Sequence, residues 1–278
     1  MIKASIGIDC GSAACKGVLL QENAILAVCV KPTGWNPRET SQAVLEQLLT
    51  KAGLERENVH IIATGYGRVS IEFANKTVTE ITCHALGADY LLPGVRAVID
   101  IGGQDSKVIA VEAGQVRSFQ MNTKCAAGTG RFLEMSANRM GIGLAEFSAL
   151  LSTGKSCSLS SMCTVFADSE IVSQLAAGKS REEVAGGIVQ LVVDRTVALA
   201  ARVEYSPPIL LTGGLAGIQG LRIALEKRTG YPVVSSELSR FAGAIGAART
   251  YWVKRARNAN KKSNFSEPVQ EPASVLWN

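Results

Sequence analysis

The stretch AVIDIGGQDSKVIAVEAGQVRSF, residues 97–119, decides the fold. It begins with an apolar run that ends near Asp100, and a glycine-containing turn separates this run from a second one that starts near Ser106. A polar turn at residues 112–115 leads into a third run. Short runs rich in β-branched residues, bounded by turn residues, are typical of strands. The stretch therefore predicts a unit of three consecutive strands.

The same plan appears in ASIGIDCGSAACKGVLLQENAILAVCV, residues 4–30. The two stretches align at a constant offset of 91 residues, with three matching polar or glycine positions: Asp9 with Asp100, Gly11 with Gly102, and Lys16 with Lys107. Such self-similarity is the mark of an internal repeat. We therefore expect two related halves.

The remaining sequence predicts helices around these strands. Apolar residues at helical spacing or small-residue runs predict helices at residues 38–52, 126–141, 164–177, 181–203 and about 240–256. A buried strand, a Gly-Gly turn and a helix are expected within residues 207–230. We expect a first domain at 1–93, a second at 94–257 whose last helix packs back on the first domain, and a disordered tail at 258–278.

Composition narrows the class of protein. Hydrophobic residues make up 47% of the 278 residues and charged residues 19%, which predicts a large packed core. Much of the net charge of +5 lies in residues 254–262, and we interpret it as a solvated basic tail without a nucleic-acid partner. No apolar run is long enough to span a membrane, and no membrane partner is expected. The seven irregularly spaced cysteines favour a reducing, cytoplasmic setting.

The two glycine turns have the chemistry of phosphate-binding loops. Glycine lets the backbone approach an anion and direct N–H groups towards it. If Asp9 and Asp100 face each other across a cleft, they can hold Mg²⁺ through water, because Mg²⁺ retains several waters. Lys16 and Lys107 could screen phosphate charge, or could instead point to solvent. A single such turn would also fit a simple tight hairpin.

The turns resemble those of the ASKHA superfamily, which includes actin, Hsp70 and acetate kinase. Asp9-Cys-Gly-Ser, Asp100-Ile-Gly-Gly-Gln-Asp105 and Leu211-Thr-Gly-Gly-Leu215 look like its phosphate-1, phosphate-2 and adenosine motifs. The resemblance implies an α/β fold of two ribonuclease-H-like domains that close over ATP or ADP. The nucleotide-binding residues that it implies are Gly11, Ser12, Ala13, Ala14, Lys16, Gly102, Gly103, Gln104, Gly213, Gly214, Ala216, Gln219 and Gly243.

Four further segments narrow the resemblance: VIDIGGQDSKVI, NTKCAAGTGRFLE, SSMCTVFADSEI and FAGAIGAA. They resemble the activators of 2-hydroxyacyl-CoA dehydratases, which are related to the ATP-binding subunits of benzoyl-CoA reductases. The resemblance covers about residues 1–256. It implies an ATPase that passes one low-potential electron from ferredoxin or flavodoxin to a dehydratase or a related iron–sulfur enzyme. Within the phosphate-2 turn, either Gln104 or Asp105 would orient the attacking water, with Asp9 and Asp100 as the other catalytic residues.

The same resemblance implies that Cys125 and Cys163 bind a [4Fe–4S] cluster shared by a homodimer. A cubane cluster takes four thiolates, and two chains with two ligands each would supply them. Both cysteines directly precede an expected helix, whose N-terminus would favour an anionic cluster. From the residues alone, a cysteine before a helix is more often a buried packing residue. Packing or structural roles are expected for Cys10, Cys15, Cys29, Cys83 and Cys157.

Alternative functions stay open on the sequence. One is an ATP-binding subunit of a benzoyl-CoA-reductase-like complex, in which the two related subunits are different chains. Others are a small-molecule kinase of the ASKHA group and a non-redox binding protein switched by ATP. The sequence contains no convincing acceptor-binding motif for a kinase.

Overall fold

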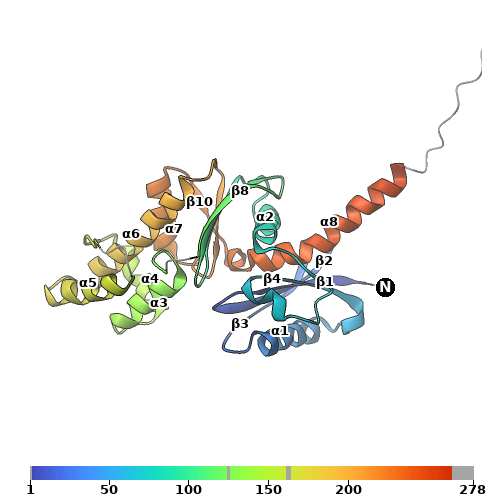
Figure 1. Ribbon diagram of the computed structural model, residues 1–278, viewed down its shortest axis with the longest axis horizontal. Coiled ribbons are helices and arrows are strands. Elements are labelled where there is room, and N and C mark those ends of the chain that lie inside the picture. The colour runs from blue at the N-terminus through green and yellow to red at the C-terminus, as the bar shows by residue number, and fades with distance from the viewer. Residues whose placement is uncertain (1, 124–125, 161–163, 265–278) are drawn as a thin grey trace, which may run out of the picture.

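The computed structural model describes residues 2–123, 126–160 and 164–264 (Figure 1). Within these residues the strands form two five-stranded sheets, ordered β3-β2-β1-β4-β5 and β10-β9-β6-β7-β8. In each sheet three consecutive strands pair antiparallel, and the first of them also pairs in parallel with a later strand. Figure 1 shows the sheets in two lobes, with α2 and α8 between them.

The first sheet consists of β1 (Ala4–Cys10), β2 (Ala14–Gln21), β3 (Ala24–Pro32), β4 (Val59–Thr64) and β5 (Lys76–Thr77). The second consists of β6 (Ala97–Ile101), β7 (Ser106–Glu112), β8 (Gln115–Asn122), β9 (Ile209–Gly213) and β10 (Val233–Val234). The α-helices are α1 (Pro37–Ala52), α2 (Glu80–Leu91), α3 (Gly130–Arg139), α4 (Leu144–Leu150), α5 (Thr164–Ala176), α6 (Arg181–Ala200), α7 (Gln219–Thr229) and α8 (Ala242–Asn264). Short 3₁₀ turns are η1 (Arg56–Asn58), η2 (Tyr66–Ser70), η3 (Leu151–Thr153) and η4 (Glu237–Phe241).

The internal repeat extends to fine detail of the backbone. The register between the second and third strands shifts at Leu19/Leu20 in one half and at Ala110/Val111 in the other. The hairpin turns contain the described non-glycine residues with positive φ, Glu22 at 53° and Ala113 at 49°. All of these positions are 91 residues apart, so the offset found in the sequence is also an offset in the structure.

Helix ends follow local sequence signals. α1 begins after Asn36, whose side chain accepts a hydrogen bond from the Glu39 amide, and it ends at Gly53 in the left-handed conformation. α6 begins with a capping box between Ser180 and Glu183. These signals explain why the expected helix boundaries agree with the structure to within a few residues at these two helices.

Small residues let α2 and α8 pack closely. A Cβ atom on Gly246 of α8 would lie 1.7 Å from the Cys83 carbonyl oxygen of α2. One on Gly7 of β1 would lie 1.9 Å from the Ala244 carbonyl oxygen. Because no side chain fits at either position, the backbones approach each other directly. Beyond this contact, Trp252 of α8 donates a hydrogen bond to Ser5 of β1 over 2.9 Å.

α2 belongs to the packing of both lobes. Its Ala85 and Ala88 lie in a buried cluster with Val98 of the second sheet. Its Cys83 lies in another cluster with Ile62 of the first sheet. α2 thus joins the two lobes at the level of the strand ends.

Two expectations about chain segments are wrong in detail. The helix expected from residue 126 begins at Gly130, because Gly128 has φ +106° and the Thr129 hydroxyl bonds back to the Ala126 carbonyl oxygen, which makes a turn. Residues 258–264, expected in the disordered tail, continue α8. Their run of Ala, Asn, Lys and Ser contains neither proline nor glycine, so a helix already nucleated by packing can propagate through it.

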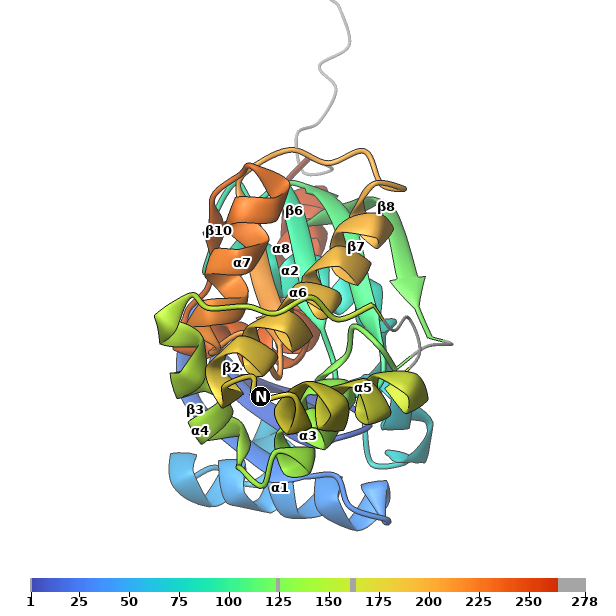
Figure 2. The ribbon, with the colours of Figure 1, turned by 90° about the vertical axis from the view of Figure 1, so that its left-hand side faces the viewer.

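The helices α3, α4 and α5 gather at one end of the molecule, which faces the viewer in Figure 2. The larger buried core lies under them and includes Phe132 of α3, Phe147 of α4 and Ile188 of α6. Among the described residues, every helix is too short or too polar to cross a membrane. The expected core cysteines Cys10, Cys15, Cys29 and Cys83 are buried in other clusters, and Cys157 is partly buried against this larger core.

Candidate functional site

A cleft of about 620 Å³ lies between the lobes, where the glycine turns after β1, β6 and β9 meet. Among the residues expected to contact nucleotide, its lining includes Gly11, Ser12, Ala13, Ala14, Lys16, Gly102, Gly103, Gln104, Gly213 and Gly214. The expected catalytic residues Asp9, Asp100, Gln104 and Asp105 line it as well. The structure thus brings together three turns that are far apart in the sequence.

The turns leave backbone, rather than side chains, at the cleft. A Cβ atom on Gly103 would lie 2.7 Å from the Ala13 Cβ, so the first two turns approach each other closely. Gly213 has φ +93°, and a Cβ atom there would lie 2.2 Å from the Ile101 carbonyl oxygen. A Cβ atom on Gly214 would meet nothing within 4 Å. Such open, glycine-rich backbone can accommodate a polyphosphate.

Three of the expected nucleotide contacts are not among the residues that line the cleft. Gln219 lines a separate groove between α4, α6 and α7, and Ala216 is buried. Gly243, at the start of α8, lies beneath the cleft, where its Cβ atom would be 2.7 Å from Asp9 Oδ2. Its close approach to Asp9 makes Gly243 part of the floor of the site.

Asp100 is buried and fully engaged by its neighbours. Thr212 donates a hydrogen bond to Oδ1 over 2.7 Å, and His84 Nδ1 lies 3.3 Å from the same oxygen. Lys107 Nζ lies 3.3 Å from Oδ2. Burial by itself raises the pKa of Asp100, but His84, Lys107 and the Thr212 hydrogen bond outweigh it and hold that pKa well below its usual range. Asp100 is therefore a stable carboxylate.

Lys107 is buried at the centre of three carboxylates. Its Nζ lies 2.8 Å from Asp105 Oδ2 and 2.9 Å from Glu80 Oε1, in addition to its contact with Asp100. Burial lowers the pKa of Lys107, but the three carboxylates outweigh it and raise that pKa above its usual range. Neither lysine of the repeated unit points to solvent, since Lys16 is buried too.

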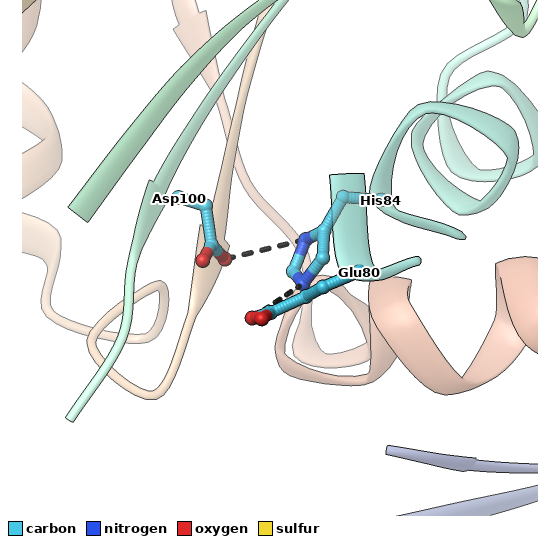
Figure 3. Close-up of side chains that lie close together, drawn as sticks. All are labelled: Glu80, His84 and Asp100. Atoms are coloured by element: carbon cyan, nitrogen blue, oxygen red, sulfur yellow. Dashed lines mark ion pairs between the residues drawn. The ribbon is translucent and has the colours of Figure 1, made fainter. Parts of the chain in front are cut away.

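Glu80 and His84 were not found from the sequence. They lie one turn apart on α2, and Figure 3 shows both side chains pointing to Asp100. Their potential ligand atoms and those of Asp100 lie within 4.8 Å of one another, as in a metal site. The Lys107 ammonium already forms ion pairs with two of these three groups, Glu80 and Asp100. The i, i+4 spacing of an acid and a histidine in a largely apolar helix was the available signal.

Asp9 has far fewer partners than Asp100. Lys16 Nζ lies 3.9 Å from Oδ2, and Oδ1 has no hydrogen-bond partner among the described residues. Burial raises the pKa of Asp9, and Lys16 only opposes that rise. An unpartnered buried carboxylate oxygen beside a phosphate turn fits a hydrated cation, so the residues present are suited to Mg²⁺.

Thr64 of β4 is the strand neighbour of Asp9, and its buried hydroxyl has no hydrogen-bond partner in the described part of the chain either. The Cys83 thiol lies beside this hydroxyl, near enough to affect it electrostatically but without the geometry of a hydrogen bond. Burial raises the pKa of Cys83 to about 12, and Thr64 opposes the rise. Thr64 and Thr212 were also missed, although each ends an apolar run and precedes a glycine.

Gln104 and Asp105, the two candidates for orienting the attacking water, differ in how firmly other residues hold their side chains. Gln104 lines the cleft, and none of the hydrogen bonds between described residues holds its side chain elsewhere. Asp105 is held by Lys107, and its backbone oxygen accepts from the Gly102 amide across the turn. Burial raises the pKa of Asp105, with Lys107 opposing. Asp105 therefore shapes the turn, and Gln104 is the freer polar group.

Cys125 and Cys163 lie outside the described residues, so the structure does not test the expected cluster. α5 begins at Thr164, next to Cys163, but α3 begins five residues after Cys125, which corrects the expectation of a helix directly after it. The start of α3 is bonded to the second phosphate turn. Gly130 and Arg131 donate their amides to the carbonyl oxygens of Gly102 and Gly103 over 2.8 and 2.9 Å.

Known proteins resemble this chain in sequence and in fold. The model of the BadF/BadG/BcrA/BcrD ATPase family matches residues 6–250. The chain belongs to this family. Family membership confirms the recognised resemblance, the ATPase class and ATP as the ligand.

Individual relatives support this family assignment. The chain is 41% identical to the (R)-2-hydroxyglutaryl-CoA dehydratase activating ATPase of Acidaminococcus fermentans, over 91% of this chain and 98% of that one. It is 31% identical to a benzoyl-CoA reductase subunit of Thauera aromatica, over 87% and 90%. The crystal structure of the activator of the 2-hydroxyisocaproyl-CoA dehydratase from Clostridium difficile with bound ADPNP matches with a TM-score of 0.86 and 34% identity, over 96% and 100%. The expected fold class is thereby confirmed.

Proposed function

We propose that this chain is an ATP-hydrolysing iron–sulfur activator of a 2-hydroxyacyl-CoA dehydratase. It would receive one electron from ferredoxin or flavodoxin in the cytoplasm and pass it on at low potential. The observation that carries the proposal is the 41% identity to a dehydratase activating ATPase over nearly the whole of both chains. At this level of likeness the nucleotide cleft and the coupled chemistry are expected together.

Within the cleft, the residues divide the work of holding nucleotide. The glycine turns at 11–14, 102–104 and 213–214 offer backbone N–H groups to the phosphates. Asp9 and Asp100 would hold Mg²⁺ through water, and Mg²⁺ would neutralise phosphate charge as the terminal bond breaks. Gln104 would orient the attacking water, because Asp105 is already held by Lys107.

Cys125 and Cys163 of each chain would ligate a [4Fe–4S] cluster on the two-fold axis of a homodimer. The start of α5 directly after Cys163 supports this proposal, since free N–H groups at a helix start favour an anionic cluster. The fit of the cluster itself rests on residues outside the described part of the chain. The cluster would supply the one-electron redox chemistry.

The start of α3 offers a route from nucleotide to cluster. The hydrogen bonds from Gly130 and Arg131 to the second phosphate turn tie that turn to the segment that follows Cys125. If phosphate binding shifts Gly102 and Gly103, the start of α3 would move with them, and it lies within a few residues of Cys125, the expected cluster ligand. Hydrolysis and electron delivery would in this way be coupled through one turn of backbone.

Iron analysis of anaerobically purified protein tests the proposal. About four iron atoms per dimer are expected, because a cubane cluster holds four. Cys125→Ala and Cys163→Ala should each lose the iron. Cys157→Ala is the matched control and should keep it, because Cys157 lies against the core of the second half. An ATPase that is active and free of iron would contradict the proposal.

A second candidate is a component of a benzoyl-CoA-reductase-like complex, favoured by the 31% identity to a benzoyl-CoA reductase subunit. In that case the chain would pair with a different, related chain. Size-exclusion chromatography with light scattering separates the two candidates, because the activator is expected to be a stable homodimer when expressed alone.

A further inference from the structure

The internal repeat includes a three-residue device at the strand ends. On neighbouring strands, Asp9 is in register with Lys16 and Thr64, and Asp100 is in register with Lys107 and Thr212. Each half thus has an aspartate between a lysine on the antiparallel side and a threonine on the parallel side. The sequence repeat included the aspartates and lysines, and the structure adds the threonines.

In the second half this device is closed. Thr212 donates to Asp100 over 2.7 Å, and both carboxylate oxygens of Asp100 have protein partners. Hydrogen bonds to a buried charge are among the stronger ones in proteins. The carboxylate of Asp100 is thereby fixed in position by the protein alone.

In the first half the same device is open. Asp9 Oδ1 and Thr64 Oγ1 are both buried, and both lack a hydrogen-bond partner among the described residues. Lys16 approaches Asp9 only to 3.9 Å. Glycines leave space on both sides of the carboxylate, since a Cβ atom would lie 2.5 Å from Oδ1 at Gly65 and 2.7 Å from Oδ2 at Gly243.

Two unpartnered polar groups in one buried place need an explanation. A buried polar atom without a partner destabilises the folded state, and such atoms are uncommon in native proteins. The closed copy shows that this strand geometry permits a threonine-to-aspartate hydrogen bond. The open copy therefore leaves Asp9 Oδ1 and the Thr64 hydroxyl available to bind or orient a ligand.

We propose that Thr64 is a positioning residue for Asp9, the aspartate expected to hold the cation that accompanies the nucleotide, and that Thr64 donates to Asp9 when the cation is bound. Asp100, held by Thr212, His84 and Lys107, is then a structural carboxylate with little direct share in cation binding. This inference rests on the proposed nucleotide site and changes the equal division of Mg²⁺ between the two aspartates. The protein ligands of the cation come mainly from the first half.

Mn²⁺ titration of the ADP-loaded full-length protein, followed by electron paramagnetic resonance, tests this division. Thr64→Val should weaken Mn²⁺ binding about tenfold or more, as expected on removing a group that orients a metal ligand. Thr64→Ser keeps the hydroxyl and should restore wild-type affinity. Thr212→Val is the matched control, and Mn²⁺ affinity should change by less than about threefold.

Thermal unfolding without nucleotide or metal gives a second readout. If Thr64 had a purely structural role, its loss would lower the melting temperature. Thr64→Val removes an unpartnered buried hydroxyl and should raise the melting temperature, whereas Thr212→Val breaks a hydrogen bond to a charge and should lower it. Unchanged Mn²⁺ affinity in Thr64→Val, or equal losses in both valine variants, would overturn the proposal. Should Thr212→Val fail to fold, the comparison of Thr64→Val with Thr64→Ser still decides.

The test needs neither reductant nor dehydratase. A protein that binds Mn²⁺ as expected but contains no iron would keep this inference and lose the proposed function. A protein that contains iron but binds Mn²⁺ equally in all variants would overturn this inference and keep the proposed function.

Discussion

Asp9 and Asp100 occupy equivalent positions in the repeat, yet their surroundings push their pKa values in opposite directions. Burial acts on both in the same sense. The difference comes from the partners within the described residues, since Asp100 has Thr212, His84 and Lys107 close by, and the ion-pair partner of Asp9 is the more distant Lys16. One carboxylate therefore stabilises the fold, and the other is left in a strained state that a ligand can relieve.

Replacing each aspartate by asparagine should change stability with opposite sign. Because the pKa of Asp100 is lowered on folding, its stabilisation is fully present above its unfolded pKa of about 3.9 and is lost as pH falls through its folded pKa. Asp100→Asn should therefore lower the free energy of unfolding at neutral pH, by about 3 kcal/mol, as for breaking a buried ion pair.

Asp9 behaves in the opposite way. Because its pKa is raised on folding, its contribution is present below its unfolded pKa and is lost as pH rises through its folded pKa. Asp9→Asn should raise the free energy of unfolding at pH 7, and the gain should shrink in mild acid, where the loss in Asp100→Asn persists. Urea unfolding with a chelator and without nucleotide measures both variants. Changes of the same sign would contradict the account.

At the scale of elements, α2 and α8 join the two lobes through backbone contact. Gly246 on α8 and Gly87 on α2 allow this approach, and the small-residue sequence FAGAIGAA is its signature. The expected helix there is present; the sequence predicted that it packs back on the segment 1–93, but not that α2 is a partner within that segment. Sequence periodicity predicts which residues are buried, and it does not predict which neighbouring backbone they meet.

Gly246→Ala should destabilise the protein strongly, because the new methyl group would lie 1.7 Å from the Cys83 carbonyl oxygen and the helices would have to separate. We expect a loss of about 3 kcal/mol, at the upper end of the usual cost of overpacking. Gly143→Ala is the control, since its methyl group would meet nothing within 4 Å. Thermal unfolding of both variants measures the effect, and equal melting temperatures would refute it.

At the scale of the whole molecule, the repeat made the fold predictable. The offset between Asp9 and Asp100 predicted two halves, and the structure adds matching sheet order, matching register shifts and matching hairpin turns. The glycine turns of the cleft were also found from sequence, because their chemistry depends on local residue type.

The rest of the site depends on contacts between distant segments. From a helix that joins the lobes, His84 reaches Asp100 and Glu80 reaches Lys107, and strand register places the threonines beside the aspartates. Their local signals, an acid and a histidine at i, i+4 and a threonine before a glycine, do not by themselves show which distant residues they meet. The helix expected after Cys125 was placed too early, because Gly128 has a positive φ and a turn there precedes the helix. A Cβ atom on Gly128 would lie 3.1 Å from the Arg195 Cβ of α6, a tertiary contact that helical periodicity does not show.

Redox titration of the anaerobic protein, once with ADP and once with a non-hydrolysable ATP analogue, tests whether nucleotide in the cleft governs a cluster on the same molecule. Electron paramagnetic resonance would report the reduced cluster at each potential. We predict midpoint potentials that differ between the two nucleotides by about 30 mV or more, where about 59 mV is a tenfold change in a one-electron equilibrium. Identical potentials with both nucleotides, or an active ATPase without a cluster signal, would contradict the account.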